Sequence, residues 1–369
     1  MPKKTEEKKE TKVKILKPPV VFDKTQKYLE QLSDVLGCPV LSYFKPASGN
    51  IWSQDLYAFV ECLKSYGQID TLALYIRSNG GQGMVSLRIV NLLRSFTKKL
   101  ILLAPSECAS AATMLALGCD EIYMGPLSSL SPVDSSLTHQ LSPLDKLNTS
   151  VPVSLDELWR VLRLWKEAES NEFGPNAKVK EGEQISKEKL LETEKTGPEN
   201  PYKYLYEYIH PLVFGAVDRY SSLSVRICKE ILSYHMKDQA LIESITKHLN
   251  YDYPAHGYPI TVREAEKIGL PVKDLTPKMQ DILNNLQLLY SELTEEKITD
   301  YDNSKYHDHS IYSVVETTGQ QLVYQQDYDK FYREAEKRYI TINDLSGWYK
   351  TQASSKTGGK SKTERIFLN

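Results

Sequence analysis

A serine placed between small residues is the feature of this sequence with the clearest chemical potential. Ser110 lies in the run ECASAA, residues 107–112, shortly after the apolar segment Leu100–Ala104. Small neighbours allow a substrate carbonyl to approach the hydroxyl, and a helix that begins here would stabilise the negative charge of a tetrahedral intermediate. A serine at a helix start is also a common N-cap. The run by itself therefore leaves a nucleophile and a plain cap as alternatives.

A glycine-rich turn precedes Ser110 by one strand and one helix. Residues 78–83, SNGGQG, follow the apolar run Thr71–Ile76. Consecutive glycines allow a sharp turn whose backbone N–H groups face an anion. The run has neither the Gly-Lys-Ser/Thr ending of a phosphate-binding loop nor the GxGxxG spacing of a dinucleotide site. The remaining chemical use is an oxyanion hole, and the alternative is an ordinary strand-to-helix turn.

The elements around these two motifs alternate between strand and helix. The predicted strands are Val40–Phe44, Thr71–Ile76, Leu100–Ala104 and Glu121–Met124, and the predicted helices are 54–66, 84–96 and 109–117. This alternation is typical of βαβ units in a parallel sheet, in which the carboxyl ends of the strands share one edge. Because ligands bind at that edge, we expect the glycine turn and Ser110 to lie there together.

The second half of the chain is mainly helical. Helices are predicted over 155–169, 202–236, 239–249, 261–268 and 275–295, a polar surface excursion at 170–200, and short strands at Ile311–Val315 and Gln321–Tyr324. Ser154 and Glu157 have the spacing of a capping box at the first of these helices. Thr261 and Glu264 repeat that spacing and predict a second capping box.

The composition indicates a cytoplasmic globular protein. The chain has 369 residues and a formal net charge of −2, so charge gives no reason to expect nucleic acid or an anionic membrane as partner. Five cysteines without a CxxC pair suit a reducing compartment. No run approaches the ~20 apolar residues of a membrane span. Residues 1–14 lack the apolar core of a signal peptide.

No cofactor or metal is expected. The sequence shows no nucleotide fingerprint, and it singles out no lysine for a pyridoxal Schiff base. His307 and His309 flank Asp308, and such a run in a polar loop is more often a solvated turn than a metal site. Cys108, two residues before Ser110, we interpret as a small packing residue rather than a second nucleophile.

Three segments of the chain resemble the Clp-fold serine peptidases: RSNGGQG at 77–83, ECASAATMLALGCDEIYMGPLSSLSPVD at 107–134 and YPAHGYPITVREAEKIGLPV at 253–272. Within that group the chain looks most like the serine dehydrogenase proteinase family, a relative of signal peptide peptidase A and of the Clp protease proteolytic subunit. The resemblance covers residues 35–275, and the middle segment is its most specific part. It implies an α/β fold of the Clp/crotonase type, a ββα superhelix with a parallel sheet core, and assembly into a homo-oligomer.

The resemblance also implies roles for the residues of both motifs. Ser110 would attack the substrate carbonyl, while backbone N–H groups near Gly80, Gly81 and Ala111 would hold the oxyanion. A free serine hydroxyl is barely nucleophilic at neutral pH, so a neighbouring base must activate it.

The base is where this sequence departs from the pattern. The histidine of the Clp subunit would fall near Asp134, with His139 a few residues on. The lysine of the signal peptide peptidase branch would fall near Lys166. The third triad element aligns with Gly257, where relatives have an aspartate. We favour His256 as the base, because a neutral imidazole suits this task, and keep the other candidates as alternatives.

The resemblance and the composition together suggest four regions. We expect a disordered charged arm at 1–20, a Clp/crotonase-like peptidase domain at 30–275, a C-terminal helix with a small α+β module at 276–345, and a flexible tail at 346–369.

The leading functional hypothesis is a serine endopeptidase that hydrolyses peptide bonds of peptide or protein substrates through an acyl-enzyme on Ser110. The first alternative is a catalytically impaired oligomeric scaffold that binds a protein partner through the C-terminal module, and the glycine at position 257 is its best support. The second is an acyl-CoA enzyme of the crotonase type. That chemistry needs acidic residues near the oxyanion hole, so a serine between alanines argues against it.

Overall fold

The computed structural model describes residues 18–134, 136–145, 149–155, 157–158, 160–161, 206, 208–295, 298–299, 304–353 and 361–368. The chain divides into two compact units. The first comprises Met1–Pro132, Ile227–Ile245 and Pro254–Asn369, and the second comprises Val133–Arg226 and Thr246–Tyr253. Among the described residues, no helix combines the length and the hydropathy needed to cross a membrane.

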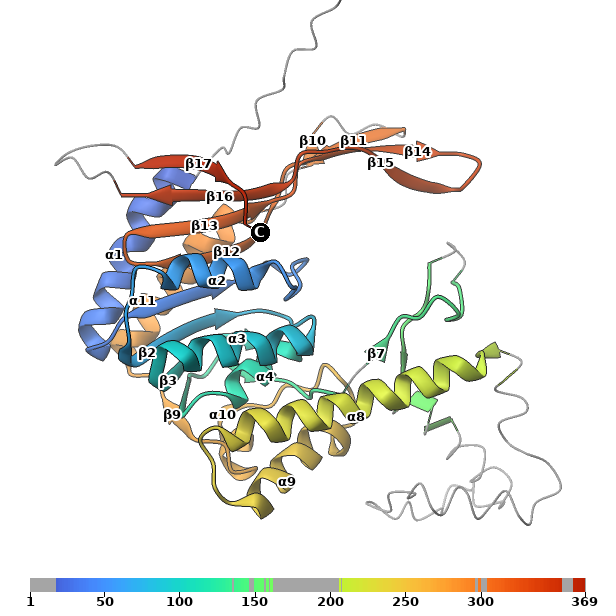
Figure 1. The fold of residues 1–369 in the computed structure, drawn as a ribbon, viewed down its shortest axis with the longest axis horizontal. Coiled ribbons are helices and arrows are strands. Elements are labelled where there is room, and N and C mark those ends of the chain that lie inside the picture. The colour runs from blue at the N-terminus through green and yellow to red at the C-terminus, as the bar shows by residue number, and fades with distance from the viewer. Residues whose placement is uncertain are drawn as a thin grey trace, which may run out of the picture. The chain divides into compact units, whose positions relative to one another are not determined.

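The first unit is a mixed α/β structure built on a nine-stranded sheet (Figure 1). Five strands run parallel: β1 (Val40–Phe44), β2 (Ile69–Arg77), β3 (Thr97–Ala104), β5 (Glu121–Met124) and β9 (Val272–Asp274). Four antiparallel strands extend the sheet beyond β1: β12 (Ile311–Thr317), β13 (Gln320–Gln325), β16 (Gly347–Gln352) and β17 (Lys362–Ile366). The order across the sheet is β17-β16-β13-β12-β1-β2-β3-β5-β9.

Helices cover both faces of this sheet (Figure 1). α1 (Pro18–Leu36) and α11 (Pro277–Leu293) lie on one face, and α2 (Asp55–Leu63), α3 (Gly83–Phe96) and α4 (Ala111–Leu117) lie on the other. Successive strand residues point to opposite faces, and β1 shows this directly. The Tyr43 ring lies 5.0 Å from that of Phe59 in α2, whereas the Phe44 ring lies 5.4 Å from that of Tyr290 in α11.

α11 illustrates how the local sequence fixes a helix. Thr276 is its N-cap, and the Thr276 Oγ1 accepts a hydrogen bond from the Met279 N–H at 3.3 Å. Pro277 follows at the first helical position, where its missing N–H costs nothing. The helix buries an apolar stripe against the sheet, formed by Met279, Ile282, Leu283, Leu286, Tyr290 and Leu293.

A buried carboxylate joins α1 and α11 to the antiparallel half of the sheet. Glu316 in β12 is fully buried and accepts four hydrogen bonds of 2.6–2.8 Å. The donors are the side chains of Thr25, Gln26, Tyr290 and Gln321. These donors favour the charged form, but burial outweighs them and raises the pKa of Glu316 to about 7.

The C-terminal strands differ from the separate module and flexible tail that the sequence suggested. β12 pairs with β1, Leu41 opposite Thr317, so these strands share one sheet with the N-terminal core. β16 and β17 lie in the range expected to be a loose tail. A second, four-stranded sheet has the order β10 (Ile298–Thr299), β11 (Lys305–Asp308), β14 (Tyr328–Arg333), β15 (Arg338–Asp344). His307 lies in β11 rather than in a turn, and its Nδ1 is 3.0 Å from Oδ1 of Asp329.

The second unit has a small apolar cluster of its own. Val153 and Leu158 are buried against Val213 and Val217 of α8 (Pro211–Ser233), a helix that also contributes residues to the first unit. Two short strands, β7 (Ser136–Leu137) and β8 (Val153–Ser154), pair antiparallel. The unit also contains the π-helix η1 (His248–Asp252), which follows α9 (Gln239–Lys247).

Most predicted elements of the parallel core are confirmed. β1 and β5 have the predicted bounds, and β2, β3, α2, α3 and α4 agree within a few residues. The capping box of Ser154 and Glu157 forms, with both hydrogen bonds at 3.1 Å. The one predicted at Thr261 is wrong, because Thr261 makes no side-chain bond at the start of α10 (Val262–Lys267). α1 was not predicted, and the polar excursion at 170–200 lies outside the described residues.

Candidate active site

Ser110 occupies the tight turn between β4 (Glu107–Cys108) and α4. Its backbone angles are φ +53° and ψ −119°, a conformation that residues with a Cβ rarely adopt. Among the described non-glycine residues, only Lys337 also has a positive φ. Such strain costs about 1–3 kcal/mol and persists only where the surrounding structure imposes it. The surrounding fold therefore holds Ser110 in a backbone conformation that serine disfavours.

The hydroxyl of Ser110 does not cap α4. Ser110 is the residue before the first helical position, but its side chain accepts no hydrogen bond from the helix. Within the described part of the chain its Oγ has no hydrogen-bond partner, and the residue is half-buried. The plain-cap alternative is therefore wrong, and the hydroxyl is uncommitted.

The segment after β5 clamps the turn that carries Ser110. The Ser110 N–H donates to Oγ of Ser131 at 2.7 Å, and that hydroxyl donates to the Pro132 carbonyl at 3.0 Å. The Ser131 N–H donates in turn to Oγ1 of Thr113 at 3.1 Å. The Thr113 hydroxyl donates to the Cys108 carbonyl at 2.8 Å, which closes the network. Ser131 and Thr113 are both buried, so these bonds are shielded from water.

The glycine turn lies directly against Ser110, as expected for two strand ends on one edge. Ser78 pairs with Cys108: the Ser78 N–H donates to the Glu107 carbonyl at 3.0 Å, and the Ala109 N–H donates to the Ser78 carbonyl at 2.9 Å. Gly80 has φ +108°, and a Cβ there would lie 2.6 Å from the Cβ of Ser110. Only glycine allows this conformation and this approach.

Two of the three N–H groups that the resemblance implied for an oxyanion hole are uncommitted. The Gly80 N–H donates to Oγ of Ser78 at 3.1 Å. The N–H groups of Gly81 and Ala111 have no acceptor among the residues that the structure describes. Ala111 is the first residue of α4, where a helix leaves its N–H groups without an internal partner. The N–H groups of Gly81 and Ala111 can therefore donate hydrogen bonds to a bound anion.

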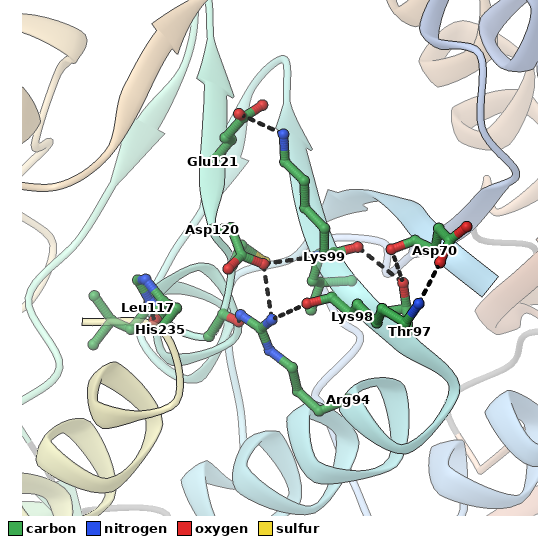
Figure 2. A network of polar contacts seen from close by, with 12 residues as sticks. Asp70, Arg94, Thr97, Lys98, Lys99, Leu117, Asp120, Glu121 and His235 are labelled. Atoms are coloured by element: carbon green, nitrogen blue, oxygen red, sulfur yellow. Dashed lines mark hydrogen bonds and ion pairs between the residues drawn. The ribbon is translucent and has the colours of Figure 1, made fainter. Parts of the chain in front are cut away.

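The far end of α4 is anchored by two side chains, one from α3 and one from the turn after α8, and both are labelled in Figure 2. Arg94 of α3 donates to the Gly118 carbonyl at 2.7 Å and to Oδ2 of Asp120 at 2.8 Å. Nε2 of His235 lies 2.8 Å from the Leu117 carbonyl, so this nitrogen carries the proton. Burial lowers the pKa of His235, which keeps the imidazole neutral. These bonds satisfy carbonyls that a helix C-terminus leaves unpaired, and they fix the helix that directly follows Ser110.

Cys108 is a packing residue. It is fully buried in β4, and burial raises the pKa of its thiol. The thiolate needed for nucleophilic attack is therefore disfavoured, which agrees with the interpretation from the sequence.

The favoured base, His256, lies in an exposed loop of the first unit. The loop runs into Ile260, whose backbone pairs with Leu130 one residue before Ser131. The structure places no hydrogen bond between His256 and the Ser110 hydroxyl. Gly257 beside it is also exposed, and a Cβ added there would meet nothing within 4 Å. The backbone at position 257 therefore has space for a Cβ.

The other base candidates belong to different parts of the chain. Asp134 and His139 are in the second unit. Nδ1 of His139 accepts a hydrogen bond from the Leu141 N–H at 3.1 Å. Lys166 lies outside the described residues. The structure therefore brings together Ser110, Gly80, Gly81 and Ala111, and within the described ranges no base is hydrogen-bonded to the Ser110 hydroxyl.

Sequence reasoning missed the role of Ser131. The residue stands in the middle segment of the resemblance, but its bond to Ser110 spans 21 positions of sequence and depends on the pairing of β4 with β6 (Ser129–Leu130). No local pattern signals such a contact. The sequence shows only that Ser131 follows the Gly125-Pro126 strand break by a few positions.

Comparison with known proteins gives weak likenesses only. No protein-family model and no curated protein matches the chain. An alanine mutant of the 1510-N membrane-bound stomatin-specific protease aligns over 71% of this chain and 86% of its own, with 11% identity and a TM-score of 0.35. A second mutant of that protease, in complex with a substrate peptide, aligns over 67% and 97%, with 15% identity and a TM-score of 0.23. Scores this low do not establish a fold or a reaction for this chain.

Proposed function

We propose that this chain is a serine endopeptidase of the Clp/crotonase type that cleaves peptide bonds through an acyl-enzyme on Ser110. The observation that carries the proposal is the state of Ser110: strained backbone, uncommitted hydroxyl, and direct contact with a glycine turn. Strain of this kind gathers at active sites, and a nucleophile on a sharp strand-to-helix turn is a recurrent arrangement in hydrolases. The parallel core, in which β1, β2, β3 and β5 alternate with α2, α3 and α4, supports the fold assignment.

The reaction would proceed in two steps. In the first, Oγ of Ser110 bonds to the substrate carbonyl carbon while its proton passes to a base, and the carbonyl oxygen becomes an oxyanion. The N–H groups of Gly81 and Ala111 would donate to that oxygen. The C–N bond then breaks and the leaving amine takes the proton. In the second step water attacks the ester, the acid product leaves, and the proton returns to Oγ.

His256 remains our candidate base, with Asp134 as a further catalytic candidate. An exposed loop can change conformation when a substrate binds, and catalytic hydrogen bonds are often formed only in the complex. Peptide or protein substrates, a homo-oligomeric assembly and a cytoplasmic location stay predictions from the sequence.

Hydrolysis of a mixed peptide library tests the proposal. We expect cleavage by the wild-type protein, detected by mass spectrometry of new termini, and none by Ser110→Ala. Equal cleavage by both proteins would show that the activity has another source.

A second candidate function is a non-catalytic scaffold of the same fold. The absence of a hydrogen bond between the Ser110 hydroxyl and a base in the described part of the chain favours it. A folded wild-type protein whose Ser110 does not react with an acylating probe would support this candidate over the peptidase.

A further inference from the structure

A fully buried ion pair joins the two ends of the loop at 46–54. Nζ of Lys45, which directly follows β1, is 2.9 Å from Oδ1 of Asp55, the first residue of α2, and both side chains have no solvent exposure. Burying two charges costs several kcal/mol per ion, and an apolar pair of similar volume is often at least as stable. A contribution to stability therefore does not by itself account for this ion pair.

Directional hydrogen bonds surround the carboxylate of Asp55. Its Oδ2 accepts from the Tyr43 hydroxyl at 2.6 Å and from the Trp52 N–H at 3.0 Å. Its Oδ1 accepts from Lys45 and, at 3.0 Å, from the hydroxyl of Ser313 in β12. Four donors from three segments (the end of β1, the loop that follows it, and β12) thus fix the position of one carboxylate. Burial lowers the pKa of Lys45, and the charge of Asp55 opposes that shift.

The ion pair closes the loop at 46–54, and this loop holds the glycine turn. Ile51 lies in the middle of the loop, and its N–H donates to the Gly80 carbonyl at 2.8 Å. Its carbonyl accepts from the Gln82 N–H at 2.9 Å. Gly81 therefore lies between two hydrogen bonds to one residue, and a Cβ on Gly81 would come 2.4 Å from the Ile51 nitrogen. The orientation of the Gly81 peptide depends on where Ile51 stands.

We propose that Asp55, paired with Lys45, is a positioning residue that holds Ile51 against Gly80 and Gly81 and so sets the direction of the Gly81 N–H. Asp55 is buried and touches no substrate; it acts through the loop. The importance of this N–H for catalysis rests on the proposed function, whereas the placement of the turn does not.

Amide hydrogen exchange tests the placement without reference to activity. In Asp55→Asn the carboxylate loses its charge and Lys45 loses its counter-ion, so we expect exchange at the Ile51 and Gln82 amides to accelerate tenfold or more. Leu102, in the middle of β3, reports global unfolding and should accelerate less. Equal acceleration at all three amides, or none at Ile51 and Gln82, would overturn the proposal.

Tyr43→Phe provides a milder variant if Asp55→Asn does not fold. It removes one hydrogen bond to Asp55 and leaves no charge unpaired. Tyr75→Phe is the matched control, because Tyr75 is equally buried but its hydroxyl has no hydrogen-bond partner among the described residues. We expect faster exchange at Ile51 and Gln82 in Tyr43→Phe and wild-type exchange in Tyr75→Phe. The same change in both variants would contradict a role for Asp55.

Reaction with a fluorophosphonate separates this inference from the proposed function. If wild-type Ser110 reacts, Asp55→Asn should react at least tenfold more slowly, and kcat for peptides should fall more than KM rises. A wild-type rate in folded Asp55→Asn would overturn the catalytic part of the inference. If wild-type Ser110 does not react, the proposed function fails, and the exchange result alone decides whether Asp55 positions the turn.

Discussion

The backbone N–H of Ser110 donates to the hydroxyl oxygen of Ser131 at 2.7 Å, and this bond ties the strained serine to the segment after β5. A residue held at φ +53° needs partners that oppose its relaxation. Ser131 is such a partner, and it binds the backbone N–H of Ser110. The Ser110 hydroxyl takes no part in this bond.

Loss of the Ser131 hydroxyl should release this restraint. In Ser131→Ala we expect the free energy of unfolding to fall by about 1–3 kcal/mol, because the half-buried N–H of Ser110 loses its acceptor. Reaction of Ser110 with a fluorophosphonate should slow by about tenfold, the rate equivalent of 1.4 kcal/mol. Urea unfolding and labelling kinetics measure the two effects. Ser106→Ala is the control: its buried hydroxyl donates to Gln287 at 2.7 Å, away from the turn, so only stability should change.

An alanine at position 80 should displace the serine. Its Cβ would need to occupy a point 2.6 Å from the Cβ of Ser110, so one of the two turns must move. We expect Gly80→Ala to fold with reduced stability and to lose at least ~100-fold in Ser110 reactivity, since small misplacements of reacting groups have effects of that order.

Gly319→Ala separates this clash from simple backbone strain. Gly319 also has a positive φ, +92°, but a Cβ there would meet nothing within 4 Å. We expect a stability loss of about 1 kcal/mol from the conformation alone and unchanged labelling of Ser110. Equal reactivity in the Gly80 and Gly319 variants would show that contact between Gly80 and Ser110 is unimportant.

Stability should depend on pH through Glu316. Its pKa is about 7 in the folded protein against an ordinary 4.5, so the folded state binds the proton more tightly than the unfolded state. This contribution is complete below pH 4.5 and is lost as pH rises through about 7. At 1.36 kcal/mol per pKa unit, the loss reaches about 3 kcal/mol.

Urea unfolding at about pH 5 and about pH 8 measures this change as the difference in unfolding free energy. In Glu316→Gln that position cannot titrate, so the variant should lose less stability between the two conditions than the wild type. A wild-type pH dependence in Glu316→Gln would assign the titration to other groups. His235 contributes with the opposite sign, because its lowered pKa costs stability as pH falls below about 6.5. Because the wild type and Glu316→Gln both contain His235, its contribution cancels when the two proteins are compared.

Arg94 should matter more for stability than its exposed neighbour Lys98, although both make ion pairs in Figure 2. Arg94→Met removes the donors to Gly118 and Asp120 but keeps the apolar stem, and we expect a loss of about 1–3 kcal/mol. Lys98 and Asp70 are more than four-fifths exposed, and surface pairs contribute little. Lys98→Met should therefore be close to neutral in thermal unfolding. Similar losses in both variants would contradict the anchoring role of Arg94.

Local patterns were sufficient for the elements that carry the site. The runs Val40–Phe44 and Glu121–Met124 are short, apolar and bounded by residues that break strands, and they form β1 and β5 with those bounds. The proximity of Gly80 to Ser110 followed from one physical rule, the shared edge of parallel strand ends.

Contacts between distant segments could not be predicted in this way. β12 lies beside β1 although Leu41 and its partner Thr317 are 276 positions apart, so a module expected to be separate completes the main sheet. Asp55 falls within the predicted helix 54–66, and only the fold shows that it is buried and hydrogen-bonded to Ser313. The base stays a prediction because a loop such as that of His256 is not positioned by periodicity.

The most direct test of the proposed nucleophile is covalent labelling of the folded protein with a fluorophosphonate, mapped by peptide mass spectrometry. We predict a single adduct on Ser110 that is absent from Ser110→Ala and from urea-unfolded protein. No adduct on folded wild-type protein, or an equal adduct on Ser110→Ala, would contradict the assignment of Ser110 as the nucleophile.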